Sequence, residues 1–115
     1  MTTEQQRKML ECAAKACGLI VIGYQGDGLL IASDGCRSGY LWKPIENAID
    51  TAEMCAKLKI ATTWGITYDF VDCSVGLLAS SNETRSWFKD HDNSRLNAWM
   101  YAATMVAAKI GGYTE

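Results

Sequence analysis

The sequence is poor in the residues that most often mark a recognisable site. Its 115 residues include one histidine, one proline and two phenylalanines, and 13 acidic against 11 basic residues give a formal net charge of −2. A domain that binds nucleic acid through its phosphates normally has a basic face and a basic balance, whereas a protein mimic of DNA would be far more acidic. The charge therefore argues against a nucleic-acid partner and names no other.

Close-set metal ligands are missing as well. The number of cysteines is odd, no Cys-x-x-Cys pair occurs, and there is no second histidine. A zinc site needs close-set pairs of Cys or His ligands, so we expect no metal and no cofactor. Reduced cysteines are typical of a cytoplasm and behave as small hydrophobic side chains when buried. The five cysteines are Cys12, Cys17, Cys36, Cys55 and Cys73.

Membrane and secretion features are also lacking. No apolar run approaches the roughly 20 residues needed to span a bilayer. The opening "MTTEQQRKMLECAAKACG" has neither the basic nor the apolar region of a secretory signal. These absences predict a cytoplasmic protein without membrane contact. The length and the 49% of hydrophobic residues predict one globular domain over residues 1–115.

Two segments in the first half have the spacing of amphipathic helices. The first helix is expected over residues 4–17, with a T-x-x-Q capping box that begins at Thr3 and a left-handed end at Gly18. The second is expected over residues 47–58, with Asn47 as its N-cap. The side chains expected on the buried face of the second helix are Ile45, Ile49, Ala52, Cys55 or Ala56, and Leu58.

A third helix is expected to follow Asp92 or Asn93, to run to about Ile110 and to end at Gly111 and Gly112. Apolar side chains surround almost the whole of it, whereas a surface helix normally has one apolar stripe. Two explanations stay open. Either the helix is covered on two sides within one chain, or one side meets a second copy. The second explanation predicts a homodimer.

Between the helices the chain has short runs typical of strands, separated by glycine-rich turns. Tight turns favour antiparallel pairing, so we predict an α+β fold: a mainly antiparallel sheet of about five strands layered with three helices. Residues 71–73 are expected to form a tight connection, and residues 81–92 an irregular loop with room for one helical turn. The expected strands are "LIVIGY", "LLIAS", "YLW", "IATTWGITYDF" and "CSVGLLAS".

Short motifs at both ends and in the middle of the chain carry a resemblance. They are "AAKACG" at residues 13–18, "LWKPIENAIDTAEMCAKLKI" at 41–60 and "DNSRLNAWMYAATMVAAKIGG" at 92–112. Together they resemble small phage and prophage proteins of the phage ABA-sandwich family. The resemblance implies an α-β-α layering and a phage or prophage gene product that acts in the host bacterial cytoplasm. It implies no catalytic residues.

The middle motif contains Trp42, Pro44 and Ile45, which we interpret as a structural corner. Pro44 has no N–H to donate and therefore ends the strand before it. Trp42 would then seat the following helix against the sheet. Packing is the usual role of an aromatic residue at the junction of two elements, and a binding role is the alternative.

The segment of residues 81–92 is the best candidate for contact with a partner. Trp87 and Phe88 stand beside Arg85, Lys89 and His91. Aromatic residues beside cations are typical of protein-binding hot spots, and they also suit stacking on a base. The competing interpretation is that one of the two aromatic side chains folds down onto the last helix.

The only His–carboxylate cluster is "KDHD", residues 89–92. Such a cluster can bind a metal or transfer protons. Adjacent loop residues rarely point at one atom, and acidic residues before a helix are expected from the helix dipole. Any Cys–His or Ser–His pair would have to use His91, so an enzyme would be a small hydrolase that depends on this residue.

The sequence thus favours a small phage or prophage accessory protein, without catalysis, that binds a host or phage protein. An anti-defence inhibitor is one protein of that class. The first alternative is a small-molecule or nucleotide-binding protein with a site between protomers, to which Arg37, Thr67, Asp69 and Arg85 would contribute. The second alternative is the hydrolase that uses His91.

Overall fold

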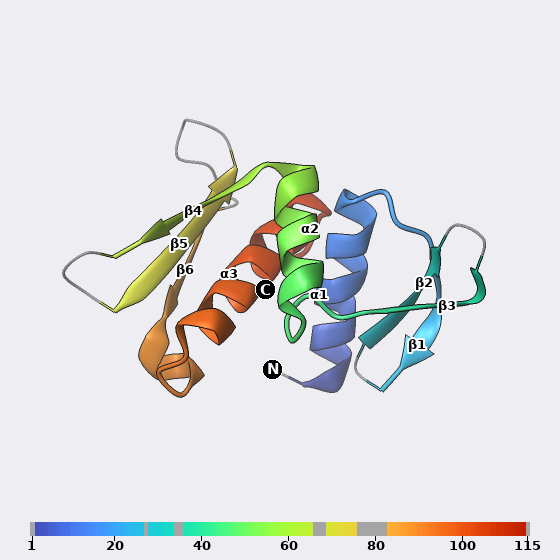
Figure 1. Cartoon of the computed structure of the whole chain (residues 1–115), viewed down its shortest axis with the longest axis horizontal. Helices are drawn as coiled ribbons and strands as arrows, with labels where there is room; N and C mark the ends of the chain where they lie inside the picture. Colours follow the sequence, from blue (N-terminus) through green and yellow to red (C-terminus); the bar gives the residue numbers. More distant parts are fainter. Residues whose placement is uncertain (1, 27, 34–35, 66–68, 76–82, 115) are drawn as a thin grey trace.

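The structure is a computed structural model that describes residues 2–26, 28–33, 36–65, 69–75 and 83–114. Three helices lie between two three-stranded antiparallel sheets (Figure 1). The helices are α1 (Thr3–Ala16), α2 (Ala48–Leu58) and α3 (Arg95–Ile110). The first sheet contains β1 (Val21–Gln25), β2 (Gly28–Ser33) and β3 (Cys36–Trp42). The second contains β4 (Ile60–Trp64), β5 (Phe70–Val75) and β6 (Thr84–Trp87), and the 3-10 helix η1 (Phe88–His91) follows it.

The α+β class and the three helices are confirmed, but a single sheet of about five strands is not. The strands form two sheets, and the helical layer separates them (Figure 1). The order is therefore sheet, helices, sheet rather than the α-β-α layering implied by the resemblance. Alternation within a strand tells which side chains share a face but not which strands pair, so the sequence could not reveal the division.

Helix α1 begins and ends through local hydrogen bonds. Its capping box starts at Thr2 and not, as predicted, at Thr3: the backbone N–H of Gln5 donates to Thr2 Oγ1, and the Thr2 N–H donates to the Gln5 side chain. Gly18 has the expected left-handed conformation, with φ of +72°. The Leu19 N–H donates to the carbonyl of Ala14, which closes the end of the helix.

Helix α2 is capped by Asn47 as predicted, because the Asn47 side chain accepts from the N–H groups of Ile49 and Asp50. Its predicted buried face is confirmed only in part: Ile45, Cys55 and Leu58 pack against the core, but Ala52 is exposed. Ile49 is 68% exposed, whereas Asp50, Thr51 and Met54 are buried. The apolar pattern misplaced part of this face because two polar residues, Asp50 and Thr51, lie on the inner side and form hydrogen bonds there.

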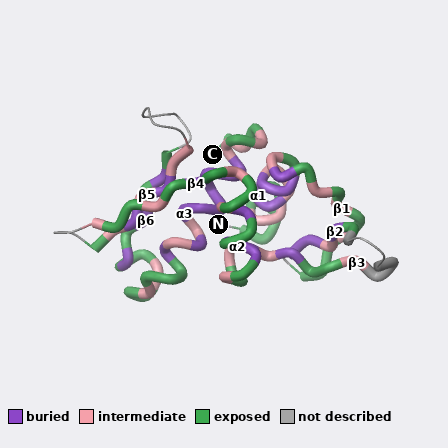
Figure 2. The backbone as a smooth tube through the Cα atoms, turned by 45° about the horizontal axis from the view of Figure 1, so that its top comes forward, coloured by how far each residue is buried: buried purple, intermediate pink, exposed green. Residues whose placement is uncertain are grey.

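Helix α3 is the centre of the core. Nine of its residues are buried, and it packs on α1 on one side and on the second sheet on the other. The apolar perimeter is therefore covered within one chain and requires no second copy, so the homodimer stays a prediction. The N-cap is Ser94, not Asp92 or Asn93, both of which have positive φ after η1. Figure 2 shows the buried residues gathered in the helical layer and on the strand positions that face it.

The end of α3 passes against the backbone of α1 at Gly111. A Cβ atom at this position would lie 1.8 Å from the carbonyl oxygen of Cys12. The φ of Gly111 is −80°, which any residue adopts, so glycine is needed here for space and not for conformational freedom. The predicted helix end at Gly111 and Gly112 is confirmed, and the Tyr113 N–H closes it by donating to Ala108.

The second sheet differs most from its prediction. The expected long strand over residues 60–70 is two strands, because the chain reverses after Trp64 and the Gly65 N–H donates to the carbonyl of Phe70. Residues 71–73, expected as a connection, lie inside β5. Residues 76–80 of the expected last strand lie outside the described residues.

The expected loop over residues 81–92 contains a strand, β6, and a 3-10 helix, η1. The strand was missed for a physical reason. Its inward positions are Thr84 and Ser86, both buried, so the alternation of β6 is hydroxyl against charged or aromatic rather than apolar against polar. A search for apolar alternation does not find such a strand.

Candidate binding site around strand β6

The alternation of β6 decides where the predicted contact residues point. Thr84 and Ser86 face α3, whereas Arg85 and Trp87 are exposed on the opposite, outer face of the sheet. Each exposed residue has a directly opposite neighbour on β5: Asp72 pairs with Arg85, and Phe70 pairs with Trp87. Cross-strand neighbours of this kind stabilise a sheet through their side chains.

The four side chains on the outer face form one connected cluster, which we call the outer-face cluster: Phe70, Asp72, Arg85 and Trp87. Arg85 donates to both carboxylate oxygens of Asp72, through Nε at 2.8 Å and Nη2 at 3.0 Å. Its guanidinium carbon lies 3.9 Å from the centroid of the Phe70 ring. The rings of Phe70 and Trp87 meet edge to face, with centroids 5.3 Å apart. The hydrogen bond from Arg85 to Asp72 raises the pKa of Arg85, so the cluster keeps its cation.

The two adjacent aromatic residues have opposite orientations. Trp87 is 38% exposed, whereas Phe88 is buried, 6.1 Å from the ring of Trp64 and beneath the guanidinium of Arg95 at the start of α3. The Phe88 N–H donates to the carbonyl of Asp69, which extends the pairing of β5 and β6 by one residue. Phe88 is therefore part of the core, and Trp87 is the contact candidate of the pair.

The remaining predicted contact residues lie on η1. Lys89 is exposed, and His91 is half-buried with its ring 5.1 Å from the ring of Tyr101 on α3. Asp92 and Asn93 then turn the chain into α3 with left-handed backbone angles. The short helix thus places His91 against α3 and leaves Lys89 and Asp90 in solvent.

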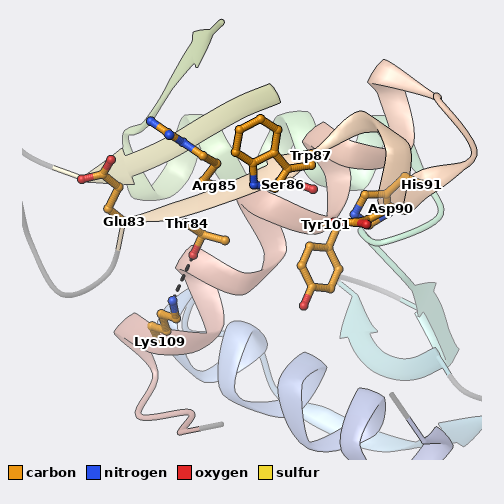
Figure 3. Close-up of a pocket in the computed structure, with 9 residues that line it drawn as sticks. All are labelled: Glu83, Thr84, Arg85, Ser86, Trp87, Asp90, His91, Tyr101 and Lys109. Atoms are coloured by element: carbon orange, nitrogen blue, oxygen red, sulfur yellow. Dashed lines mark hydrogen bonds between the residues drawn. The ribbon is translucent and has the colours of Figure 1, made fainter. Parts of the chain in front are cut away.

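Beside β6 lies an open pocket of about 560 Å³, which we call the β6 groove (Figure 3). Lys109 crosses it from α3, and its Nζ donates to Thr84 Oγ1 at 3.2 Å. The hydroxyl of Ser86 is buried and has no hydrogen-bond partner among the described residues. The residues that line the groove are Glu83, Thr84, Arg85, Ser86, Trp87, Asp90, His91, Tyr101 and Lys109.

The β6 groove gives little support to the hydrolase that uses His91. A nucleophilic serine must lie within hydrogen-bond reach of its base. Ser86 is the buried serine of the groove, and its hydroxyl forms no hydrogen bond to His91 or to any other described group. The Thr84 hydroxyl already accepts from Lys109. Hydroxyl and imidazole therefore line one pocket without forming a catalytic pair.

Three of the thiols are poor nucleophiles because they are buried or half-buried. The described cysteines are free, and burial raises the pKa of Cys17, Cys55 and Cys73, to about 12 for Cys55 and about 11 for Cys73. The thiolate is the reactive form, so these side chains react slowly at neutral pH. No group of three or more Cys, His, Asp or Glu in the described part of the chain could hold a metal ion.

The small-molecule site between protomers stays a prediction, and two of its residues lie on different sheets. Arg37 belongs to β3 of the first sheet and Arg85 to β6 of the second, and the helices stand between them (Figure 1). Arg85 is also engaged by Asp72. Thr67 lies outside the described residues, as does the side chain of Arg37.

The corner residues pack into the scaffold. Trp42 and Pro44 are buried, and the Pro44 carbonyl accepts a hydrogen bond from the hydroxyl of Thr51. Ile45 is half-buried against the core and shares a second pocket, of about 300 Å³, with His91 and Tyr101. The neighbouring Asp50, which the sequence did not single out, anchors this corner to α2 by accepting from the Tyr40 hydroxyl and the Lys43 N–H.

Comparison with family models, curated proteins and solved structures found no match to this chain. No described helix has the length and apolar character that crossing a bilayer requires.

Proposed function

We propose that this protein is a non-catalytic binding protein whose contact surface is the outer-face cluster together with the β6 groove. The observation that carries the proposal is the exposed Trp87 beside an Arg85 that is held in place by Asp72 and Phe70. Tryptophan and arginine are, with tyrosine, the residues enriched in binding hot spots.

The arrangement suits binding because Arg85 and Trp87 are already ordered, so they lose little side-chain entropy when a partner binds. A free arginine side chain loses rotamer freedom when it binds a partner, and each immobilised side chain of this kind costs about 0.5–1.5 kcal/mol. Here the guanidinium is held by two hydrogen bonds and the ring of Phe70, and the Trp87 indole meets that ring edge to face. A partner would therefore meet an already ordered surface.

The partner we propose is a protein, from the host or from a phage. The nearly balanced charge gives no general attraction for nucleic acid. The resemblance to small phage and prophage proteins is a reason to look among bacterial proteins, and an anti-defence inhibitor would be one such activity.

The experiment compares two single alanine variants as baits on a bacterial lysate. Trp87→Ala removes the exposed indole of the second sheet. Tyr24→Ala removes an aromatic ring of the first sheet that is 51% exposed and is the matched control. We expect a partner recovered by the parent protein to be lost with Trp87→Ala and kept with Tyr24→Ala, and its affinity to fall by about 30-fold or more in the first case.

Circular dichroism melting curves establish that both baits are folded. Recovery of the same partners, with equal affinity, by both variants would show that the outer-face cluster is not the contact surface. If the partner is lost with Tyr24→Ala and kept with Trp87→Ala, the contact surface lies on the first sheet.

A further inference from the structure

The β6 strand is an edge. In the described part of the second sheet the order is β4-β5-β6, so β6 pairs only with β5. The Phe88 N–H donates to Asp69, and residues opposite each other alternate between bonded and non-bonded pairs in an antiparallel ladder. The backbone groups of Ser86 and Thr84 therefore point to β5, and those of Arg85 and Trp87 point outward.

The β6 groove runs along this edge. Five consecutive residues, 83–87, line it. A pocket on one face of a strand is lined by alternate residues, because successive side chains point to opposite faces. A run of consecutive residues means that the pocket lies beside the backbone, where the outward groups of Arg85 and Trp87 are found.

Charged side chains lie at both ends of the groove. Lys109 lies at the Thr84 end, and Asp90 lies beyond the Trp87 end, beside His91 (Figure 3). Glu83 also lines the Thr84 end, and as the second residue before Arg85 in the strand direction it shares the outer face with that cation. Neither Lys109 nor Asp90 forms an ion pair with a described residue. The groove thus follows a strand edge with outward-pointing backbone groups. Lys109 supplies a cation at one end and Asp90 a carboxylate at the other, while Glu83 lies next to Arg85 on the outer face.

We infer that the groove binds an extended segment of the partner protein, which adds to the sheet as a strand antiparallel to β6. This inference rests on the proposed function and names the form of the partner. Backbone hydrogen bonds to an exposed edge are a known mode of peptide recognition. An antiparallel segment begins at the Trp87 end and ends at the Thr84 end. Its earlier part therefore meets Asp90, and its later part meets Lys109.

Asp90 and Lys109 then determine the order of charged residues in the bound segment. A basic residue precedes an acidic residue or a free C-terminal carboxylate, with about four residues of extended chain between the ends of β6. Alternate side chains of the segment would lie over Trp87 and over Tyr101. Burial against these rings favours apolar or aromatic residues at those positions.

The test uses a positional library of synthetic eight-residue peptides with free C-terminal carboxylates, screened against the full chain. We expect selected peptides to carry a basic residue before an acidic residue or the free terminus. Each selected peptide is then made with single backbone N-methyl groups at every position. N-methylation should weaken binding at least tenfold at alternate positions and leave the intervening ones within about threefold, since only alternate N–H groups face the neighbouring strand.

A charge exchange tests the direction of the segment. The double variant Lys109→Glu with Asp90→Lys should prefer peptides with the acidic residue first, whereas Lys8→Glu, an exposed change on α1, should keep the original preference. Melting curves show whether each variant is folded, and Lys109→Gln repeats the test with a milder change at the same position.

Three outcomes overturn the inference: a library that yields no binding peptide, binding without a two-residue period of N-methyl sensitivity, or an unchanged preference after the charge exchange. The proposed function fails separately, when capture of the partner is indifferent to Trp87→Ala. A partner that needs Trp87 but shows none of the strand signatures would leave the binding surface correct and the strand pairing wrong.

Discussion

Each sheet has an exposed aromatic residue that lies close to an arginine and an acidic residue, but the two groups connect different elements. In the first sheet, Tyr24 donates a hydrogen bond to Glu11 and lies beneath Arg7, and both of these partners belong to α1. In the second sheet, Trp87, Arg85 and Asp72 all lie on one sheet face. The first group ties a strand to a helix, whereas the second ties only strands and leaves its outer side to solvent.

The outer faces differ accordingly. The first sheet presents Ile22, Leu30 and Leu41 beside glycines at which a Cβ atom would touch these aliphatic side chains. Such a face offers apolar area without directional groups. The second sheet offers an ordered cation and an indole, which can discriminate between partners by geometry. The comparison is the reason for assigning recognition to the second sheet and support to the first.

The largest loss of stability is expected at the contact between α1 and the end of α3, because these helices belong to the layer on which both sheets pack. Gly111→Ala places a methyl group against the Cys12 backbone, so it should lower the free energy of unfolding by about 3 kcal/mol or more. Gly23→Ala, in the first sheet, meets only Leu30 Cδ1 at 3.7 Å and should change stability by less than about 0.5 kcal/mol. Urea unfolding measures both. Equal losses would contradict the close contact of α1 with α3.

The next largest loss of stability is expected from removing one of two carboxylates that accept hydrogen bonds, Asp50 beside the first sheet and Asp72 in the second. Asp50→Ala leaves the Lys43 N–H and the partly exposed Tyr40 hydroxyl without their acceptor in a partly buried corner and should cost about 2 kcal/mol. Asp72→Ala breaks a half-exposed ion pair and should cost about 0.5 kcal/mol. Chemical denaturation of the two variants checks the ranking, and a larger loss for Asp72→Ala would reverse the roles assigned to the two sheets.

The smallest effect concerns Tyr40. The hydrogen bond from its hydroxyl to Asp50 raises the pKa of Tyr40 to about 12, above the value of about 10 for an unfolded chain. The folded state thus favours the protonated phenol. Its contribution to stability is complete below pH 10 and disappears as the pH rises to 12.

Tyr40→Phe should therefore cost about 1 kcal/mol at pH 8 and progressively less between pH 10 and 12. Unfolding of the variant and the parent protein at a series of pH values gives the difference directly. The control is Tyr40→Phe made in an Asp50→Asn background, because the carboxylate that raises the pKa of Tyr40 is then absent. A constant difference over this range would show that the Tyr40 hydroxyl does not depend on Asp50.

Much of the local structure could be predicted because its causes lie within a few residues. The left-handed end at Gly18 and the Asn47 cap follow from hydrogen bonds between near neighbours. The start of α3 was misplaced because Asp92, Asn93 and Ser94 are all good capping residues, and the sequence does not show which one the chain selects.

The candidate site was found only in part. Arg85 and Trp87 stood out by residue type, but Phe88 beside them belongs to the core. Phe70, Asp72 and Lys109, which complete the outer-face cluster and the groove, carried no signal in the sequence. Their relation to β6 appears only when the strands pair and α3 packs beneath them.

By itself the sequence determined the three helices, the Asn47 cap, the left-handed end at Gly18 and the hairpin of β1 and β2, because hydrogen bonds and turn preferences act between residues close in the chain. Only the tertiary structure decided the division into two sheets, the side on which Trp87 lies and the reach of Lys109 to Thr84, 25 residues away. Contacts at such separations depend on how whole elements pack, and no local pattern encodes the choice among packings.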